Sequence, residues 1–251
     1  MRRWLLLRRV AVALIICVTA ICSLQDTVAD EKKPLRVCIL SGCPTYASEQ
    51  SLPIFQKWLE DHYAVQCRRL IRVADDDLPG LENLDDCDVI LVFFKRMKLK
   101  GEQLAGFQKY VRSGRPIVAV RTASHAVQTW LEFDPEILGG NYKGHYEKEP
   151  VTVIHRTKAG EDHPILKDVN LTTAPGPLYK NAGHARDINI LLNGENPGQL
   201  EPIAWTREVN GGRLFYTSLG DPKTFEDDGF RTMLANALFW TSRNSATVLK
   251  P

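Results

Sequence analysis

The feature that most constrains the fold is a short apolar run at residues 116–120 with a polar cluster directly after it. A run of this length is typical of a strand buried in a parallel sheet. Because ligands of open α/β sheets bind beyond the carboxyl ends of the strands, Arg121, Ser124 and His125 are expected to face a pocket. Many α/β enzymes carry a cysteine or serine nucleophile at such a turn, but this chain carries arginine there.

Strand-like apolar runs and helical patterns alternate through the first half of the chain. Apolar residues recur on one face of residues 48–63 and 101–113, which predicts two amphipathic helices. Repeated strand–helix units predict an α/β fold with a parallel sheet that is covered on both faces. The predicted strands are 35–40, 64–71, 88–94 and 116–120.

The second half of the chain has a different pattern. Residues 133–149 are rich in glycine, tyrosine and charge, and are expected to form an insertion or a long loop. Two apolar runs at 202–207 and 213–218 flank an Asn-Gly-Gly sequence at 210–212, which suits positive φ and predicts a hairpin. Residues 225–241 are predicted to form a closing helix.

Residues 1–29 have the layout of a secretory signal peptide, with an arginine-rich start, an apolar run over 10–22 and a small-residue cleavage site. This run is too short to cross a hydrocarbon core of about 30 Å, so no stable membrane anchor is expected. We therefore expect export to the periplasm or the extracellular space. Cleavage removes four arginines and Asp26, which changes the formal net charge from +2 to −1 and leaves no basis for a nucleic-acid partner.

Four cysteines remain after cleavage, and their spacing matches no zinc motif. Two of them lie in apolar strand patterns, which favours an interpretation as buried structural thiols. An even number of cysteines in an oxidising compartment also permits disulfides, and a metal or catalytic role is a third alternative. The four are Cys38, Cys43, Cys67 and Cys87.

Seven short segments occur along the chain in this order: GRPIVAVRTASHA, LGGNYKGH, DHPIL, LYK, IAWT, GRLFYTSLG and NALFW. Together they resemble the ThuA-like family, which is named for trehalose utilisation and is similar in fold to class I glutamine amidotransferases. The resemblance covers residues 35–243 and leaves 244–251 as a tail. It implies a flavodoxin-like three-layer sandwich with a mostly parallel sheet, a C-terminal hairpin and a helix. It also implies a link to sugar metabolism without a settled reaction.

The chain departs from the amidotransferase pattern at both reactive positions. Those enzymes need a cysteine at the strand-to-helix turn, where this chain has Arg121, and a His-x-Glu pair later in the chain. The later position is Asp221 followed by Pro222, although many ThuA-like relatives carry histidine there. These two departures argue against a thioester glutaminase.

The candidate catalytic residues are His125 as acid or base, with Arg121 and Asp221 orienting the substrate. A structural ion pair is the alternative for Arg121, because an isolated buried charge is costly. A Ser124–His125 nucleophile pair is less favoured than Ser124 as a helix cap, because adjacent residues at a helix start point about 100° apart.

The candidate substrate-binding residues include Gly140, Tyr142 and His145, in a loop that suits sugar stacking but is also compatible with a mobile surface loop. His125, His145, His184 and Asp221 could in principle bind zinc, but their spacing is not that of a recognisable metal site, so we predict no metal and no cofactor. Ser124, Tyr179, Cys43 and Tyr46 complete the predicted pocket.

The leading hypothesis is an exported enzyme, of hydrolase or isomerase type, that acts on a carbohydrate or an oxidised-sugar derivative without a cysteine nucleophile. The sugar class rests on the resemblance, since the residues alone indicate only a polar pocket. The alternative is a non-catalytic carbohydrate-binding module. The expected partner is a small-molecule carbohydrate, and the oligomeric state stays open.

Overall fold

A computed structural model describes residues 33–147 and 151–249. The described residues from Pro34 onward form one compact unit. The predicted signal peptide at 1–29 lies outside the described residues. Within the described part of the chain, no helix has both the length and the apolar character needed to span a membrane.

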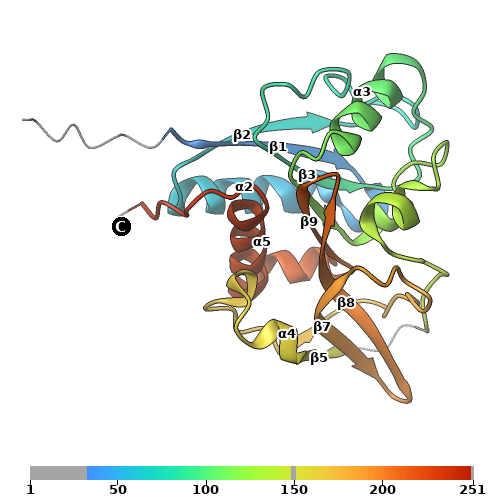
Figure 1. Cartoon of the computed structure of the whole chain (residues 1–251), viewed down its shortest axis with the longest axis vertical. Helices are drawn as coiled ribbons and strands as arrows, with labels where there is room; N and C mark the ends of the chain where they lie inside the picture. The colour runs from blue at the N-terminus through green and yellow to red at the C-terminus, as the bar shows by residue number, and fades with distance from the viewer. Residues whose placement is uncertain (1–32, 148–150, 250–251) are drawn as a thin grey trace, which may run out of the picture. The chain divides into compact units, whose positions relative to one another are not determined.

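A single nine-stranded sheet has the order β2-β1-β3-β4-β9-β8-β7-β5-β6 (Figure 1). The predicted strands of the first half are confirmed, and they pair in parallel. Every residue of β3 is buried because helices cover both faces there. These strands are β1 Leu35–Gly42, β2 Val65–Ile71, β3 Val89–Phe94 and β4 Ile117–Val120.

The second half of the sheet corrects the prediction of a mostly parallel sandwich. Its strands pair antiparallel with one another, and only β9 is parallel to a strand of the first half, β4. The sheet is therefore mixed. The short turns that join β7 to β8 and β8 to β9 are the physical reason, since parallel neighbours need a long crossover. These strands are β5 Thr152–Arg156, β6 Thr173–Ala174, β7 Asn189–Asn196, β8 Gln199–Val209 and β9 Gly212–Thr217.

The predicted hairpin is the β8–β9 pair. Asn210 and Gly211 between the two strands have φ values of 52° and 80°, as the turn sequence requires. Here the local sequence is sufficient to determine the pairing.

Helices α2 (Ser48–His62) and α5 (Asp228–Thr241) pack on one face of the sheet, and α3 (Gly101–Arg112) packs on the other. The predictions for α2 and α3 are confirmed. The closing helix begins later than predicted, because the Asp227 side chain accepts a hydrogen bond from the Phe230 N–H and caps α5. A separate 3₁₀ helix, Pro222–Glu226, precedes it.

Residues 133–149 are not wholly a loop. Phe133–Leu138 form a short π-helix that buries Phe133 and Leu138 against the core around α3. The remaining described helix of the α type is the single turn α4, Lys158–Glu161. The prediction of an insertion or a long loop is therefore wrong for the first third of this segment.

The order of the parallel strands determines where a ligand can bind. From β1 the chain moves outward to β2 on one side and then returns to β3 on the other. The loops after β1 and β3 therefore diverge and leave a crevice beyond the carboxyl ends of the strands. The polar residues after β3 and β4 lie at this edge.

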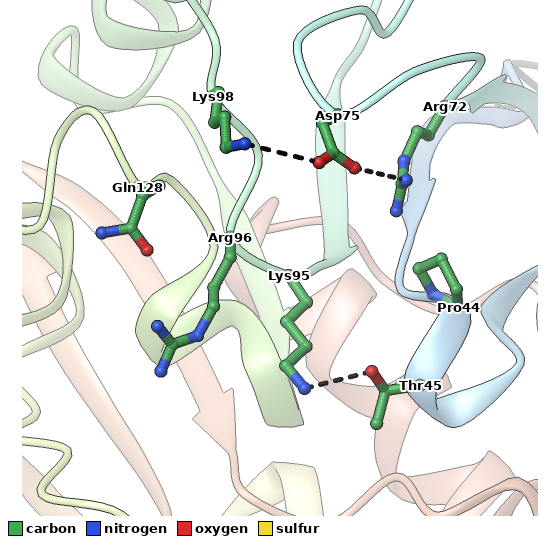
Figure 2. Close-up of a pocket in the computed structure, with 8 residues that line it drawn as sticks. All are labelled: Pro44, Thr45, Arg72, Asp75, Lys95, Arg96, Lys98 and Gln128. Atoms are coloured by element: carbon green, nitrogen blue, oxygen red, sulfur yellow. Dashed lines mark hydrogen bonds and ion pairs between the residues drawn. The ribbon is translucent and has the colours of Figure 1, made fainter.

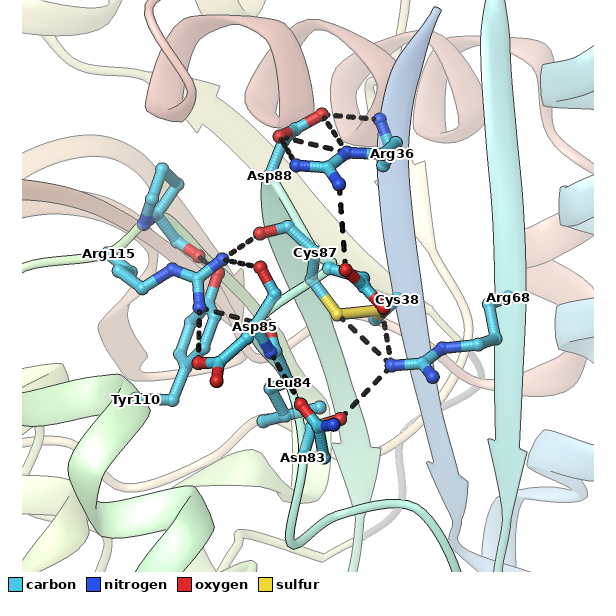
Figure 3. Close-up of a disulfide and its surroundings, with 12 residues drawn as sticks. Arg36, Cys38, Arg68, Asn83, Leu84, Asp85, Cys87, Asp88, Tyr110 and Arg115 are labelled. Carbon is cyan, nitrogen blue, oxygen red and sulfur yellow. Dashed lines mark hydrogen bonds and ion pairs between the residues drawn. A yellow bond between two sulfur atoms is a disulfide. The ribbon is translucent and has the colours of Figure 1, made fainter.

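A disulfide joins Cys38 of β1 to Cys87, just before β3 (Figure 3). The two Cα atoms are 5.6 Å apart, because β1 and β3 are neighbours in the sheet. The interpretation of all four cysteines as thiols is thus wrong for this pair, whereas Cys43 and Cys67 are free thiols. The Arg68 guanidinium lies against Cys38 Sγ at 3.5 Å.

We expect reduction of the disulfide to lower the free energy of unfolding by about 2–4 kcal/mol, because the link closes a long loop in the unfolded chain. Urea denaturation with and without dithiothreitol measures the change. The double variant Cys38→Ser/Cys87→Ser is the control and should not respond to the reductant. Identical midpoints for the oxidised and the reduced parent would contradict the expectation.

Candidate functional site

A cavity of about 460 Å³ opens beyond the carboxyl end of β4. The turn after β4 forms one wall, and the π-helix with the loop after it forms the other. The lining residues are Arg96, Ser124, His125, Gln128, Leu131, Asp134, Pro135, Asn141, Tyr142, Lys143 and Gly144.

Arg121 lies behind this cavity and does not line it. Its side chain is only 1% exposed, and its backbone has a φ of 47°, a conformation that is uncommon outside glycine. The guanidinium donates to the Ser218 carbonyl at 2.7 Å and to the Tyr46 hydroxyl at 3.1 Å. It also lies 4.2 Å and 5.0 Å from the ring centroids of Tyr46 and Tyr179.

Arg121 does not form the structural ion pair that was the alternative prediction for it. In the described part of the chain, no carboxylate oxygen comes within 4.0 Å of this guanidinium. Its Nε also has no hydrogen-bond partner. Aromatic faces and a carbonyl oxygen stabilise the charge instead.

Ser124 and His125 interact directly, contrary to the prediction. Ser124 Oγ lies 3.1 Å from His125 Nδ1. The segment Arg121–His125 is itself a 3₁₀ turn and no helix starts after it, so Ser124 has no helix to cap. The His125 ring also stacks on the Tyr142 ring, with 4.4 Å between centroids.

His125 is neutral at physiological pH. Burial lowers its pKa to about 3, and the positive charges of Arg96, Lys95 and Arg121 act in the same direction. The imidazole can therefore accept or donate a hydrogen bond, but the protonated form is not available as an acid near pH 7. The role predicted for His125 is therefore reduced from that of an acid or base to that of a hydrogen-bond donor or acceptor.

Asp134 is the functional candidate that the sequence analysis missed. This buried carboxylate accepts a hydrogen bond from the Tyr142 N–H at 2.9 Å through Oδ2, and its Oδ1 has no partner. Burial raises its pKa to about 6, and the Tyr142 N–H bond partly opposes the shift. A carboxylate among the apolar residues of the FDPEIL segment was the available signal.

Gly140 supports Asp134 by leaving room for it. A Cβ on Gly140 would collide with the Asp134 carboxylate, so this position requires glycine. Gly140 therefore acts through the carboxylate rather than by lining the cavity itself.

Three further predicted residues do not line the cavity. Tyr179 is 1% exposed, and its ring centroid is 4.6 Å from that of Tyr142. Tyr46 contacts Arg121 on the same buried side. The Cys43 thiol is buried, and burial raises its pKa, so it does not supply a thiolate near neutral pH.

The last two predicted residues do not reach the cavity wall. His145 is exposed, and its Nδ1 lies 2.7 Å from the Tyr146 carbonyl oxygen. Asp221 accepts from the Lys223 N–H and caps the 3₁₀ helix that follows β9. Both Asp221 and Arg121 have atoms within 4 Å of the position that a Cβ on Gly176 would take.

The possible zinc ligands in the sequence are His125, His145, His184 and Asp221. Across residues 33–147 and 151–249, no group of three or more His, Cys, Asp and Glu side chains is arranged to hold a metal ion. His184 lies instead with its Nδ1 3.0 Å from the Ala185 carbonyl oxygen. The absence of a cofactor stays a prediction.

The geometry brings together a carboxylate and an imidazole with opposite pKa shifts. Both groups line one cavity and both contact Tyr142, Asp134 through the backbone and His125 through the ring. Such a pair can exchange a proton and donate a hydrogen bond near neutral pH.

Comparison with known proteins identifies the fold and the family of this chain. Two solved ThuA-like proteins share the fold. The one from Parabacteroides merdae has 18% identity, a TM-score of 0.68 and coverage of 87% of this chain and 94% of its own. The one from Bacteroides uniformis has 20% identity, a TM-score of 0.64 and coverage of 84% and 92%.

A β-galactosidase from Bacillus circulans matches at 12% identity, with a TM-score of 0.57 and coverage of 90% of this chain and 34% of its own. At these identities the likeness concerns the fold alone. A search of curated proteins finds no match. The model of the ThuA family, described as trehalose utilisation, matches residues 36–241. The chain therefore belongs to the ThuA family.

Proposed function

We propose that this protein is an enzyme that acts on a carbohydrate or an oxidised-sugar derivative by proton transfer in the cavity beyond β4. The observation that carries the proposal is the pairing of Asp134 and His125 in one cavity with pKa values shifted in opposite directions. Two titratable groups whose pKa values are shifted in opposite directions by their surroundings are suited to acid–base chemistry.

Asp134 is the proton-transfer group in this proposal. A pKa of about 6 lies close to neutral pH, where a base is both ionised and able to hold a proton. Asp134 lines the cavity, and among the described residues its buried Oδ1 has no hydrogen-bond partner that would compete with a hydroxyl of the substrate. This assignment moves the base from His125, where the sequence analysis placed it.

His125 polarises the substrate as a neutral hydrogen-bond donor. In this proposal the Ser124 hydroxyl donates to Nδ1, which lies 3.1 Å from Oγ, so the imidazole carries its proton on Nε2 and can donate it to a carbonyl or hydroxyl oxygen. Since His125 occupies one face of the Tyr142 ring, Tyr142 orients His125 rather than offering that face to a sugar. Arg121 supports this arrangement from beneath through Tyr46 and Tyr179.

Export to an oxidising compartment is part of the same proposal. The Cys38–Cys87 disulfide supports it, because disulfides persist mainly outside the cytosol. The alternative function is a non-catalytic carbohydrate-binding module. It is favoured by the turn after β4, where Arg121 takes the place of a cysteine or serine nucleophile.

The Asp134→Asn variant should lose turnover by about 10²–10⁴-fold, because the amide keeps the shape of the side chain but cannot take a proton. Substrates come from a screen of disaccharides and their keto derivatives, with products detected by mass spectrometry. The matched control is Glu136→Gln, which removes an exposed carboxylate of the same π-helix outside the cavity lining.

Full activity of Asp134→Asn would refute its role as the proton-transfer group. If the parent binds sugars in the screen but converts none of them, the binding-module alternative replaces the enzyme.

Acid stability tests the state of His125. Between pH 6.5 and about 3 the unfolded chain binds a proton that the folded protein does not, so the free energy of unfolding falls as the pH falls through this window. We expect His125→Gln to reduce this fall, since the opposite contribution of Asp134 is common to both proteins. Urea denaturation from pH 7 to pH 4 measures the difference, and a His125 NMR signal that titrates near pH 6.5 would contradict it.

A further inference from the structure

A second concave surface, the basic groove, lies beside the cavity at the carboxyl ends of β1, β2 and β3 (Figure 2). Its volume is about 550 Å³. It occupies the crevice where the chain leaves β1 in two directions, which is where open α/β sheets bind ligands. The lining residues are Pro44, Thr45, Arg72, Asp75, Lys95, Arg96, Lys98 and Gln128.

The charge of the basic groove is not balanced by the protein. Its one carboxylate, Asp75, pairs with Arg72 at 2.6 Å and with Lys98 at 3.7 Å. Lys95 donates to the neutral Thr45 hydroxyl at 3.0 Å. Among the described residues, neither Lys95 nor Arg96 has a carboxylate oxygen within 4.0 Å, and Figure 2 shows the Arg96 guanidinium directed away from Asp75.

Arg96 is held in position by its backbone. Its φ of 48° is uncommon for a side chain with a Cβ, and its N–H donates to the His125 carbonyl oxygen at 2.9 Å. The next N–H, that of Met97, donates to the Ala126 carbonyl oxygen at 2.7 Å. Strained backbone of this kind is often found at ligand sites, and here it places a cation beside the reactive turn.

The basic groove and the cavity adjoin each other. Arg96 and Gln128 line both, so one ligand can extend from the His125 side into the groove. Burial is the main cause of the low pKa of His125, and the nearby positive charges of Arg96 and Lys95 lower this pKa further.

We propose that the basic groove binds an anionic substituent, a phosphate or a carboxylate, of the substrate whose sugar part occupies the cavity. The identity of the sugar part rests on the proposed function. Lys95 and Arg96 contact the anion, because they are the two cations that no carboxylate of the groove engages. The substrate class is therefore a sugar phosphate or a sugar acid rather than a neutral sugar.

Isothermal titration calorimetry with glucose 6-phosphate, gluconate, glucose and inorganic phosphate tests this assignment. The variant is Lys95→Gln/Arg96→Gln, and the control is Lys109→Gln, which removes an exposed cation of α3 outside both surfaces. We expect the double variant to bind the charged ligands roughly tenfold to 100-fold more weakly, because each charge-assisted bond contributes strongly to binding. The control should bind like the parent.

Of glucose 6-phosphate and gluconate, the ligand that the parent binds more tightly identifies the anion as a phosphate or a carboxylate. Either result supports the proposal. Equal affinities of the parent and the double variant for both would overturn it, as would a parent that binds no anion. Circular dichroism confirms that the variants are folded.

The failure of the groove and the failure of the proposed function are distinguishable. Asp134→Asn should retain the affinity of the parent for inorganic phosphate, which contacts only the basic groove, even where turnover is lost. Anion binding without turnover of any sugar would leave the groove assignment intact and refute the enzyme, whereas turnover of neutral sugars alone would refute the groove.

Discussion

The buried guanidinium of Arg121 is the interaction on which the rest of the site depends. It lies directly after β4, a strand in the interior of the sheet, and is stabilised by the Ser218 carbonyl and two tyrosine rings rather than by a carboxylate. A guanidinium is weakly hydrated and stacks on aromatic faces, so it tolerates this position better than an ammonium would. Glycines at 176 and 220 allow the neighbouring loops to approach it closely.

The reactive groups are arranged in layers above this cation. Tyr179 and Tyr46 contact the guanidinium, Tyr142 packs on Tyr179, and His125 stacks on Tyr142. Burial in this stack keeps the imidazole neutral, while burial of Asp134 keeps its carboxyl partly protonated near pH 6. Burial therefore raises the pKa of the carboxyl group and lowers the pKa of the imidazole. The cations of the basic groove lower the pKa of His125 further.

Local sequence patterns predicted the parts of the fold that depend on neighbours in the chain. Periodicity located α2 and α3, apolar runs located β1 to β4, and the Asn-Gly turn located the β8–β9 hairpin. The Cys38–Cys87 pairing and the antiparallel pairing of β5 with β7 depend on long-range contacts that spacing does not encode. Asp134 was missed because its π-helix has neither the period of an α-helix nor that of a strand.

The disulfide lies before the start of β3, whereas the cavity and the basic groove lie beyond the opposite, carboxyl ends of the same strands. The covalent link therefore constrains the unfolded chain without touching any reactive group. Substitutions that alter the tolerance of the protein to heat or denaturant can accumulate at one end of the sheet while the loops at the other end diversify. Stability and ligand specificity, which often oppose each other, thus depend on different ends of the sheet in this fold. Related chains can therefore change their specificity without losing stability.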